Sequence, residues 1–210
     1  MIRIALVGDI GSGKTFISTL FKYPIFNADK EVEKIYRNNK KCYFRIKKKL
    51  PKYFSKFPLK KQELVNSILS NKKNLKVITN IVHPIIKKKI NYFLKKNKLK
   101  KIVILDIPLF FENSLNRKGD YIIFIKSKKK KILREIKKRK GYNKKLLDQF
   151  RKIQLPLEIK KRKSNFIINN DFKKITAKKY VKKILKQIYE RNSFRYRNDW
   201  LIYSRRPQNC

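Results

Sequence analysis

The sequence contains few of the residues that build disulfide frameworks and metal clusters. It has two cysteines, Cys42 and Cys210, and a single histidine, His83. Two cysteines cannot form a disulfide framework, so the sequence suits a reducing compartment. One histidine and two distant cysteines also fall short of the roughly four ligands of a zinc site. The composition therefore excludes a disulfide-stapled secreted fold and a structural zinc domain.

Long hydrophobic runs are lacking as well. No apolar segment approaches the roughly 20 residues that a membrane-spanning helix needs. The apolar run at the N-terminus is short and leads directly into a glycine-containing motif, which is unlike a signal peptide. We therefore expect a cytoplasmic protein with no membrane partner.

Acidic residues are scarce beside basic ones. The chain has 14 Asp and Glu against 59 Lys and Arg, which gives a formal net charge of +45. Such a charge suggests a nucleic-acid-binding protein. The basic residues are mostly lysines spread along the whole chain, accompanied by abundant Ile and Asn and only 5 Gly. This pattern indicates a global coding bias more than a local binding patch, so we expect non-specific attraction to polyanions.

The length and hydrophobic content predict a folded core. A chain of 210 residues with 41% hydrophobic residues is typical of one domain, or of one core with insertions.

The first distinctive feature is a phosphate-loop motif at residues 8–15, GDIGSGKT. The preceding residues 2–7 are mostly apolar and rich in β-branched side chains, which predicts a buried strand. Apolar residues recur at helical spacing over residues 16–21. The motif therefore has the strand before it and the helix after it that a phosphate loop requires.

This motif predicts nucleotide binding. Glycines let backbone N–H groups curl around phosphate oxygens, and the following helix directs its positive end at the same anion. We expect Lys14 to be a solvent-facing ligand of the β- and γ-phosphates and Thr15 to ligate Mg²⁺. The candidate ATP-binding residues are Gly8, Gly11, Ser12, Gly13, Lys14, Thr15 and Phe16.

A second short strand is predicted at residues 24–27, followed by a helix over residues 30–37. Asp29 lies between them, where it has two interpretations. It is either the N-cap of that helix or a functional carboxylate at the carboxyl end of a strand, where α/β sheets bind their ligands.

Three further strands are predicted at residues 102–105, 121–125 and 166–168. Asp106 ends the first of them. An acid at that place often holds Mg²⁺ through water in phosphate-loop enzymes, and the alternative is that Asp106 caps the next turn.

Residues 40–97 show mainly helical patterns. His83 and Pro84 interrupt them, and Pro84 is well placed as the first residue of a new helix. A lone histidine before a helix is more often a cap or a packed polar residue than a catalyst, and both interpretations stay open.

Residues 127–163 are strongly basic and helical, with a turn at residues 141–143. Arg134, Arg139 and Arg151 offer planar forks for phosphate oxygens, so this hairpin is a candidate lid, although most of its charge suits a solvated face. A final helix is predicted over residues 173–191, and the basic tail beyond it contains Trp200.

The alternation of strands and helices predicts a three-layer α/β/α fold with a five-stranded parallel sheet, as in phosphate-loop kinases. The core comprises residues 1–28, 99–126 and 164–191. A helical acceptor-binding insertion spans residues 29–98, the lid spans 127–163, and the basic tail spans 192–210. No strand is followed by the N-K-x-D sequence with which a GTPase reads guanine.

Together these motifs resemble those of the dephospho-CoA kinases, over roughly residues 2–189. The matching segments are GDIGSGKT at 8–15, NAD at 27–29, HP at 83–84, PLFFE at 108–112, the lid arginines Arg134 and Arg139, Gln154 followed by Leu-Pro, and Lys-Arg before the last strand. Asn27 stands where the family usually has Asp, and Ser164-Asn165 stands where it usually has Ala-Asp.

The resemblance implies the last step of coenzyme A synthesis, in which ATP with Mg²⁺ phosphorylates dephospho-CoA. It implies Asp29 as the general base, assisted by Lys14, Arg134 and Arg139, and Thr15 and Asp106 as metal ligands. The implied acceptor-binding residues are His83, Pro108, Leu109 and Glu112. We expect a monomer. The alternatives are another phosphate-loop kinase for a nucleotide or small alcohol, and a basic nucleic-acid-binding protein.

Overall fold

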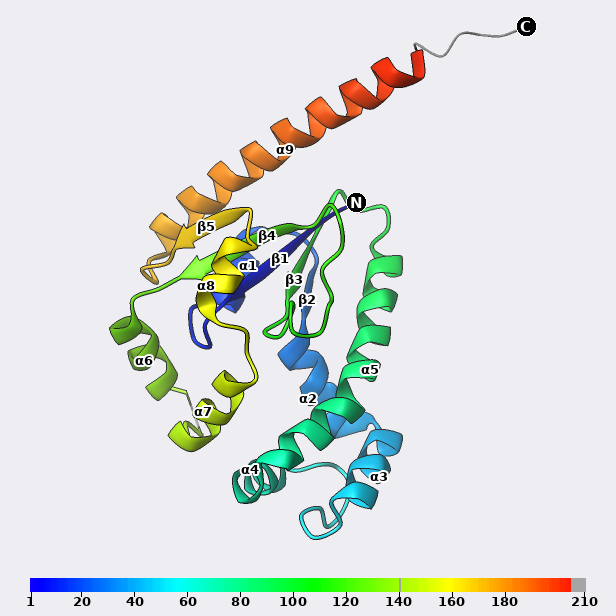
Figure 1. Ribbon diagram of the computed structural model, residues 1–210, viewed down its shortest axis with the longest axis vertical. Helices are drawn as coiled ribbons and strands as arrows, with labels where there is room; N and C mark the ends of the chain where they lie inside the picture. Colours follow the sequence, from blue (N-terminus) through cyan, green and yellow to red (C-terminus); the bar gives the residue numbers. More distant parts are fainter. Residues whose placement is uncertain (140, 205–210) are drawn as a thin grey trace, which may run out of the picture.

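The computed structural model describes residues 1–139 and 141–204, with side chains described up to residue 192. Its centre is a sheet of five parallel strands in the order β2-β3-β1-β4-β5 (Figure 1). The strands are β1 (Ile2–Gly8), β2 (Ile25–Asn27), β3 (Ile102–Asp106), β4 (Tyr121–Lys126) and β5 (Phe166–Asn169). The predicted sheet and the number of its strands are therefore confirmed.

The strand register gathers polar residues at one edge of the sheet. Leu6 and Asn27 are both aligned with Asp106, from β1 and β2 respectively. Gly8, where the phosphate loop begins, is aligned with Ile125 of β4. All strands are parallel, so their carboxyl ends meet at this edge, where α/β sheets bind ligands.

Residues that alternate along the strands belong to two apolar clusters, one on each face of the sheet. Val7, Val103 and Phe124 belong to the cluster that includes α2 (Ala28–Asn38) and α5 (Lys72–Lys96). Leu6, Ile104 and Ile125 belong to the cluster that includes α1 (Lys14–Leu20) and α9 (Lys174–Ser204). Both faces are thus buried, which explains the nearly continuous apolar strands and confirms the three-layer fold.

The helical insertion contains α2, α3 (Lys40–Lys49), α4 (Lys61–Ser70) and α5. The predicted helix start at Pro84 is wrong, because α5 passes through His83 and Pro84 without ending. Buried residues on both sides of the proline, Val82 and Ile86 among them, form one continuous stripe. Pro84 and Asn80 are exposed, so water can satisfy the Asn80 carbonyl that loses its helical donor.

The predicted lid contains α6 (Lys129–Lys137) and α7 (Lys144–Lys152), followed by α8 (Leu157–Arg162). Asn143 caps α7 by accepting a hydrogen bond from the Leu146 backbone N–H at 2.9 Å. Leu146 and Phe150 of α7 pack against the apolar cluster that contains the insertion, and α7 contacts α4. Figure 1 shows lid and insertion extending to the same side of the sheet, so both border its carboxyl edge.

The last helix is longer than predicted. α9 continues past residue 191 to Ser204, through most of the segment expected to be a weakly patterned tail (Figure 1). The Trp200 side chain lies outside the described residues.

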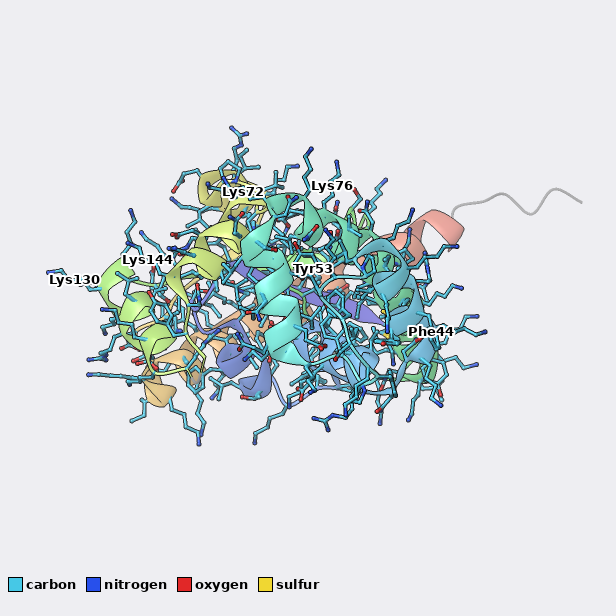
Figure 2. The ribbon with its side chains drawn as sticks, turned by 90° about the horizontal axis from the view of Figure 1, so that it is seen from below. Phe44, Tyr53, Lys72, Lys76, Lys130 and Lys144 are labelled. Carbon is cyan, nitrogen blue, oxygen red and sulfur yellow. The ribbon has the colours of Figure 1, made fainter. Side chains whose placement is uncertain are left out.

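No helix of the described part of the chain combines the length and apolarity needed to cross a membrane. Labelled lysines on the insertion and lid, such as Lys72 and Lys144, point outward in Figure 2.

Candidate active site

The phosphate loop between β1 and α1 depends on glycine at two points of close approach. Gly13 has φ +91°, and a Cβ there would lie 2.3 Å from Asn170 Nδ2. Gly8 has φ +144°, and a Cβ there would lie 2.6 Å from the Ile125 carbonyl oxygen. Both the positive φ and the crowding exclude larger residues. The loop therefore owes its curvature to the glycines that define the sequence motif.

Residues from the ends of β4 and β5 support this loop. Asn170 Nδ2 and Ser127 Oγ both donate to the Ser12 carbonyl oxygen, at 2.8 Å and 3.0 Å. The Ser12 hydroxyl is itself buried and has no hydrogen-bond partner among the described residues. A buried hydroxyl in such a loop suits a phosphate oxygen as its acceptor.

The prediction that Lys14 faces solvent is wrong, because the residue is buried and only 8% of its surface is exposed. Its ammonium donates to the carbonyl oxygens of Gly8 at 3.2 Å and Asp9 at 2.8 Å. Burial lowers the pKa of Lys14 to about 8, and the negative charge of Asp106 partly opposes this shift. An incoming polyphosphate would favour the charged form, so the site is arranged for an anion.

Thr15, Asn27 and Asp106 meet at one carboxylate oxygen. Thr15 Oγ1 and Asn27 Nδ2 each donate to Asp106 Oδ2 at 2.7 Å. Asn27 also caps α2, because its Oδ1 accepts from the Lys30 backbone N–H at 2.9 Å. The interpretation of Asp29 as the N-cap is therefore wrong, since Asn27 caps the helix and Asp29 lies in its first turn.

Asp29 is a candidate for proton transfer. Water reaches its side chain, but the surrounding protein desolvates it enough to raise its pKa, and the negative charge of Asp106 adds to this shift. Lys14 and Arg139 act in the opposite direction. A carboxylate with a raised pKa is a better proton acceptor near neutral pH than an ordinary aspartate.

The oxygen donors beside the loop fit a magnesium ion. Thr15 offers a hydroxyl and Asp106 a carboxylate, which are the hard ligands that Mg²⁺ prefers. The described residues contain no group of three or more His, Cys, Asp or Glu side chains that could hold a metal. Mg²⁺ in kinases is usually bound through one or two protein groups together with substrate phosphates, so this small donor set is sufficient.

The three lid arginines differ in what they reach. Arg134 and Arg139 are exposed, and Arg134 pairs with its neighbour Glu135 at 3.7 Å. Arg151 Nη2 instead lies 3.3 Å from Asp9 Oδ2 in the phosphate loop. Asp9 and Arg151 both line a cavity of about 420 Å³, which residues 154–157 also border. Arg151, one of the three lid arginines considered from the sequence, therefore contacts the phosphate loop in this conformation, although it was not assigned a role in the site.

The predicted acceptor-binding residues are only partly brought together. Pro108, Leu109 and Glu112 follow β3 directly, and Glu112 pairs with Lys160 of α8 at 2.8 Å. His83 is partly buried on α5, where burial lowers its pKa. Within the described part of the chain it forms no hydrogen bond or ion pair with the other candidate residues.

Phe16 has a packing role in this structure. The side chain lies on α1 and packs against the apolar cluster shared by α1 and α9. Its expected part in nucleotide binding therefore stays a prediction.

Several supporting contacts were not predicted from the sequence. They join distant segments: Ser127 and Asn170 to the phosphate loop, Arg151 to Asp9, and Lys160 to Glu112. Asn170 could have been considered from its position just after a predicted strand, because that is the edge where the site lies. Nothing in the local pattern distinguished Lys160 from the other lysines.

Comparison with known proteins shows a family. The dephospho-CoA kinase family model matches residues 2–175. A dephospho-CoA kinase from Wolbachia sp. subsp. Brugia malayi is 30% identical over 192 residues, which cover 89% of this chain and 96% of that protein. The enzyme from Zymomonas mobilis is 33% identical over 128 residues, covering 60% of this chain and 65% of its relative.

Solved structures share the fold. TT1252 from Thermus thermophilus superposes with a TM-score of 0.73 at 22% identity, covering 89% of this chain and 96% of that one. The dephospho-CoA kinase from Campylobacter jejuni superposes with a TM-score of 0.56 at 24% identity and the same coverages.

Proposed function

The chain belongs to the dephospho-CoA kinase family, and from this premise we propose that it transfers the γ-phosphate of ATP to the ribose 3′-hydroxyl of dephospho-CoA, giving coenzyme A. The observation that carries the proposal is the cluster of Lys14, Asp29 and Asp106 at the carboxyl edge of the sheet. A phosphate-binding ammonium and a proton-accepting carboxylate are thereby within electrostatic reach of each other.

Lys14 and the phosphate loop bind the polyphosphate of ATP. The loop presents backbone N–H groups at the start of α1, and the Lys14 ammonium exchanges its carbonyl partners for phosphate oxygens. In this role Lys14 offsets the negative charge that develops on the transferred phosphoryl group.

Asp29 orients the acceptor and takes its proton. It accepts a hydrogen bond from the 3′-hydroxyl, holds that oxygen in line with the γ-phosphorus, and receives the proton as the new P–O bond forms and the bond between the γ-phosphorus and the departing ADP breaks. The raised pKa of Asp29 favours this proton transfer. Pro108, Leu109, Glu112 and His83 belong to the walls that receive dephospho-CoA in this proposal.

Thr15 and Asp106 are the residues that would hold Mg²⁺. When bound, the ion supplies positive charge to the β- and γ-phosphates. Asn27 keeps Asp106 in place through its own hydrogen bond.

Arg134 and Arg139 act from the lid. Both are exposed, so they are free to close over the phosphates and exclude water from the reaction. Arg139 already interacts electrostatically with Asp29. We further propose that the protein acts as a monomer in the cytoplasm, which size-exclusion chromatography and fractionation would test.

A coupled assay tests the proposed reaction. The full chain is incubated with MgATP and dephospho-CoA, and ADP release is measured alongside coenzyme A formation. We expect one ADP per coenzyme A and no comparable turnover with nucleosides, nucleotides or small alcohols as acceptors. Faster turnover with one of those acceptors would replace dephospho-CoA by another substrate and leave the phosphate-loop kinase assignment in place.

A further inference from the structure

Lys160 is a buried cation that the proposed mechanism does not use. It lies on α8, and its side chain is 1% exposed. Its Nζ is 2.8 Å from Glu112 Oε1 and 2.9 Å from Gln154 Oε1. One ammonium thus joins the segment that follows β3 to the segment that follows the lid helix α7.

A chain of residues joined by hydrogen bonds leads from Lys160 through Gln154 and Arg151 to the phosphate loop. The Gln154 backbone N–H donates to the Arg151 carbonyl oxygen at 3.1 Å. Arg151 in turn donates to the Asp9 carboxylate at 3.3 Å. The Asp9 carbonyl oxygen accepts from Lys14 Nζ at 2.8 Å. The path therefore connects a buried residue of α8 with the ammonium that binds phosphate.

Glu112 also bonds directly to the segment that follows α7, in addition to its link through Lys160. Its Oε1 also accepts a hydrogen bond from the Leu155 backbone N–H at 2.8 Å. We call residues 154–157 the strap, because they connect the last turn of α7 with α8. All four strap residues line the cavity between Arg151 and Asp9. The Lys160–Glu112 pair thus holds in place the strap, which forms one wall of that cavity.

Stability alone does not account for this pair. Burying an ion pair carries a desolvation cost that well-packed apolar residues of similar volume would avoid. Glu112 Oε2 is also buried and has no hydrogen-bond partner among the described residues. The pair also borders the candidate active site, where proteins keep polar groups for function at a cost in stability.

We propose that Lys160 is a positioning residue for phosphoryl transfer, which holds the strap against Glu112 and thereby fixes Arg151 at the phosphate loop. Arg151 then exchanges its bond to Asp9 for one to a nucleotide phosphate when ATP binds. This inference rests on the proposed function for the identity of the acceptor, but its effect on nucleotide affinity is independent of the acceptor.

The first test compares Lys160→Met with Lys161→Met. Lys161 is the next residue of α8 and forms only an exposed pair with Glu158 at 3.6 Å. The measurement is the dissociation constant of the magnesium complex of the ATP analogue AMP-PNP, by titration calorimetry on the folded full chain. We expect Lys160→Met to weaken binding roughly 10- to 100-fold, the worth of a hydrogen bond to a charged group, and Lys161→Met to leave it unchanged.

A purely structural role would give a different result. Lys160→Met would then lower the melting temperature while the folded protein bound the analogue with wild-type affinity. That outcome would overturn the proposal.

A double-mutant cycle with Arg151→Ala tests the path itself. If Lys160 acts through Arg151, adding Lys160→Met to Arg151→Ala should weaken analogue binding no further. Fully additive losses would overturn the proposal, because they would show that the two residues act independently.

If Lys160→Met fails to fold, Gln154→Leu still tests the proposal. This change preserves the Lys160–Glu112 pair and removes only its side-chain link to the strap. We expect it to weaken analogue binding about tenfold, which is the effect of losing a charge-assisted hydrogen bond. Unchanged affinity would overturn the proposal.

A wild-type chain that binds the analogue but does not phosphorylate dephospho-CoA would contradict the proposed function alone, since these comparisons need no acceptor.

Discussion

At the amino-terminal end of the sheet, Arg3 and Asp120 form a buried ion pair at 3.2 Å, whereas at the carboxyl end the Lys14 ammonium donates, among the described residues, only to backbone carbonyls. Arg3 also donates to the Leu115 carbonyl oxygen at 3.0 Å, and Asp120 accepts from the Arg117 backbone N–H at 2.8 Å. Thus Arg3 and Asp120 have each other as ion-pair partners, although Arg3 Nε and Nη1 form no hydrogen bond among the described residues.

The carboxyl end is arranged in the opposite way. Asp29 and Asp106 are close enough for the charge of Asp106 to raise the pKa of Asp29. Lys14 is buried nearby with a pKa of about 8, mainly because of its desolvation. Like charges face each other and the cation lacks a bonded carboxylate, so an incoming anion completes the site. The difference indicates that the buried charges are paired with each other at one end and left for a ligand at the other.

The strongest test of this comparison is Lys14→Ala. We expect it to abolish phosphotransfer, because the residue supplies the main cationic contact to the β- and γ-phosphates. The melting temperature should hardly fall, since the change removes a buried charge with no ion-pair partner. Enzyme assay and thermal unfolding of the same preparation measure both effects. Near-normal turnover would rule out the phosphate-loop assignment.

The next largest effect is expected for Asp29→Asn. The amide still orients the ribose hydroxyl but accepts no proton, so kcat should fall by roughly 10²–10⁴ with little change in substrate binding. Because the base works when deprotonated, the wild-type rate should rise with pH through the Asp29 pKa. The raised pKa places this rise at higher pH than for an ordinary aspartate.

A pH–rate profile of the wild type and the variant completes this test. The Asp29→Asn profile should lack the acidic limb. Wild-type-like turnover in the variant would show that positioning alone is sufficient and that the assigned base is wrong.

At the amino-terminal end, Arg3→Met should act on stability and spare catalysis. It leaves Asp120 buried without its partner, which typically costs roughly 3–5 kcal/mol of unfolding free energy. The kcat of the folded enzyme should stay unchanged. Chemical denaturation measures the loss, and the double variant Arg3→Met/Asp120→Leu is the control that should recover much of it. A reduced kcat with intact stability would break the contrast between the two ends.

The smallest effect is expected from the exposed lysines, which belong to neither end. Figure 2 shows such side chains on the insertion and the lid, including Lys76 and Lys130. Exposed charges are screened within about 8 Å at physiological salt. Nucleic-acid binding should therefore weaken steeply with added salt and differ by less than about twofold between unrelated sequences. Fluorescence anisotropy with two labelled oligonucleotides would detect a salt-resistant preference, which would revive the nucleic-acid alternative.

Local patterns in the sequence predicted the sheet well. Each strand is a short apolar run because helices bury both faces of the sheet, and the glycines of the phosphate loop are required by its backbone angles. The ends of helices were harder to predict. Pro84 is compatible with α5 only because it faces water, and Asn27 rather than Asp29 caps α2 through a side-chain rotamer that the pattern does not encode.

The candidate site was predicted where it depends on a motif and missed where it depends on long-range pairing. Lys14, Thr15 and Asp106 follow from position relative to the strands. The sequence singled out Arg151 as a lid arginine but predicted neither its pairing with Asp9 nor that of Lys160 with Glu112, because these partners are far away in the sequence. In a chain with 59 basic residues, composition cannot distinguish such lysines and arginines from those on the surface.

The support of the phosphate loop by Asn170 has a consequence for synthesis on the ribosome. The hydrogen bond to the Ser12 carbonyl spans 158 residues of the chain, and β1 at the centre of the sheet pairs only with the later strands β3 and β4. The motif is translated before these strands, yet its contact with Asn170 can form only after β5 has emerged. We therefore expect a nascent chain to be unable to retain nucleotide until nearly all of the core has been made.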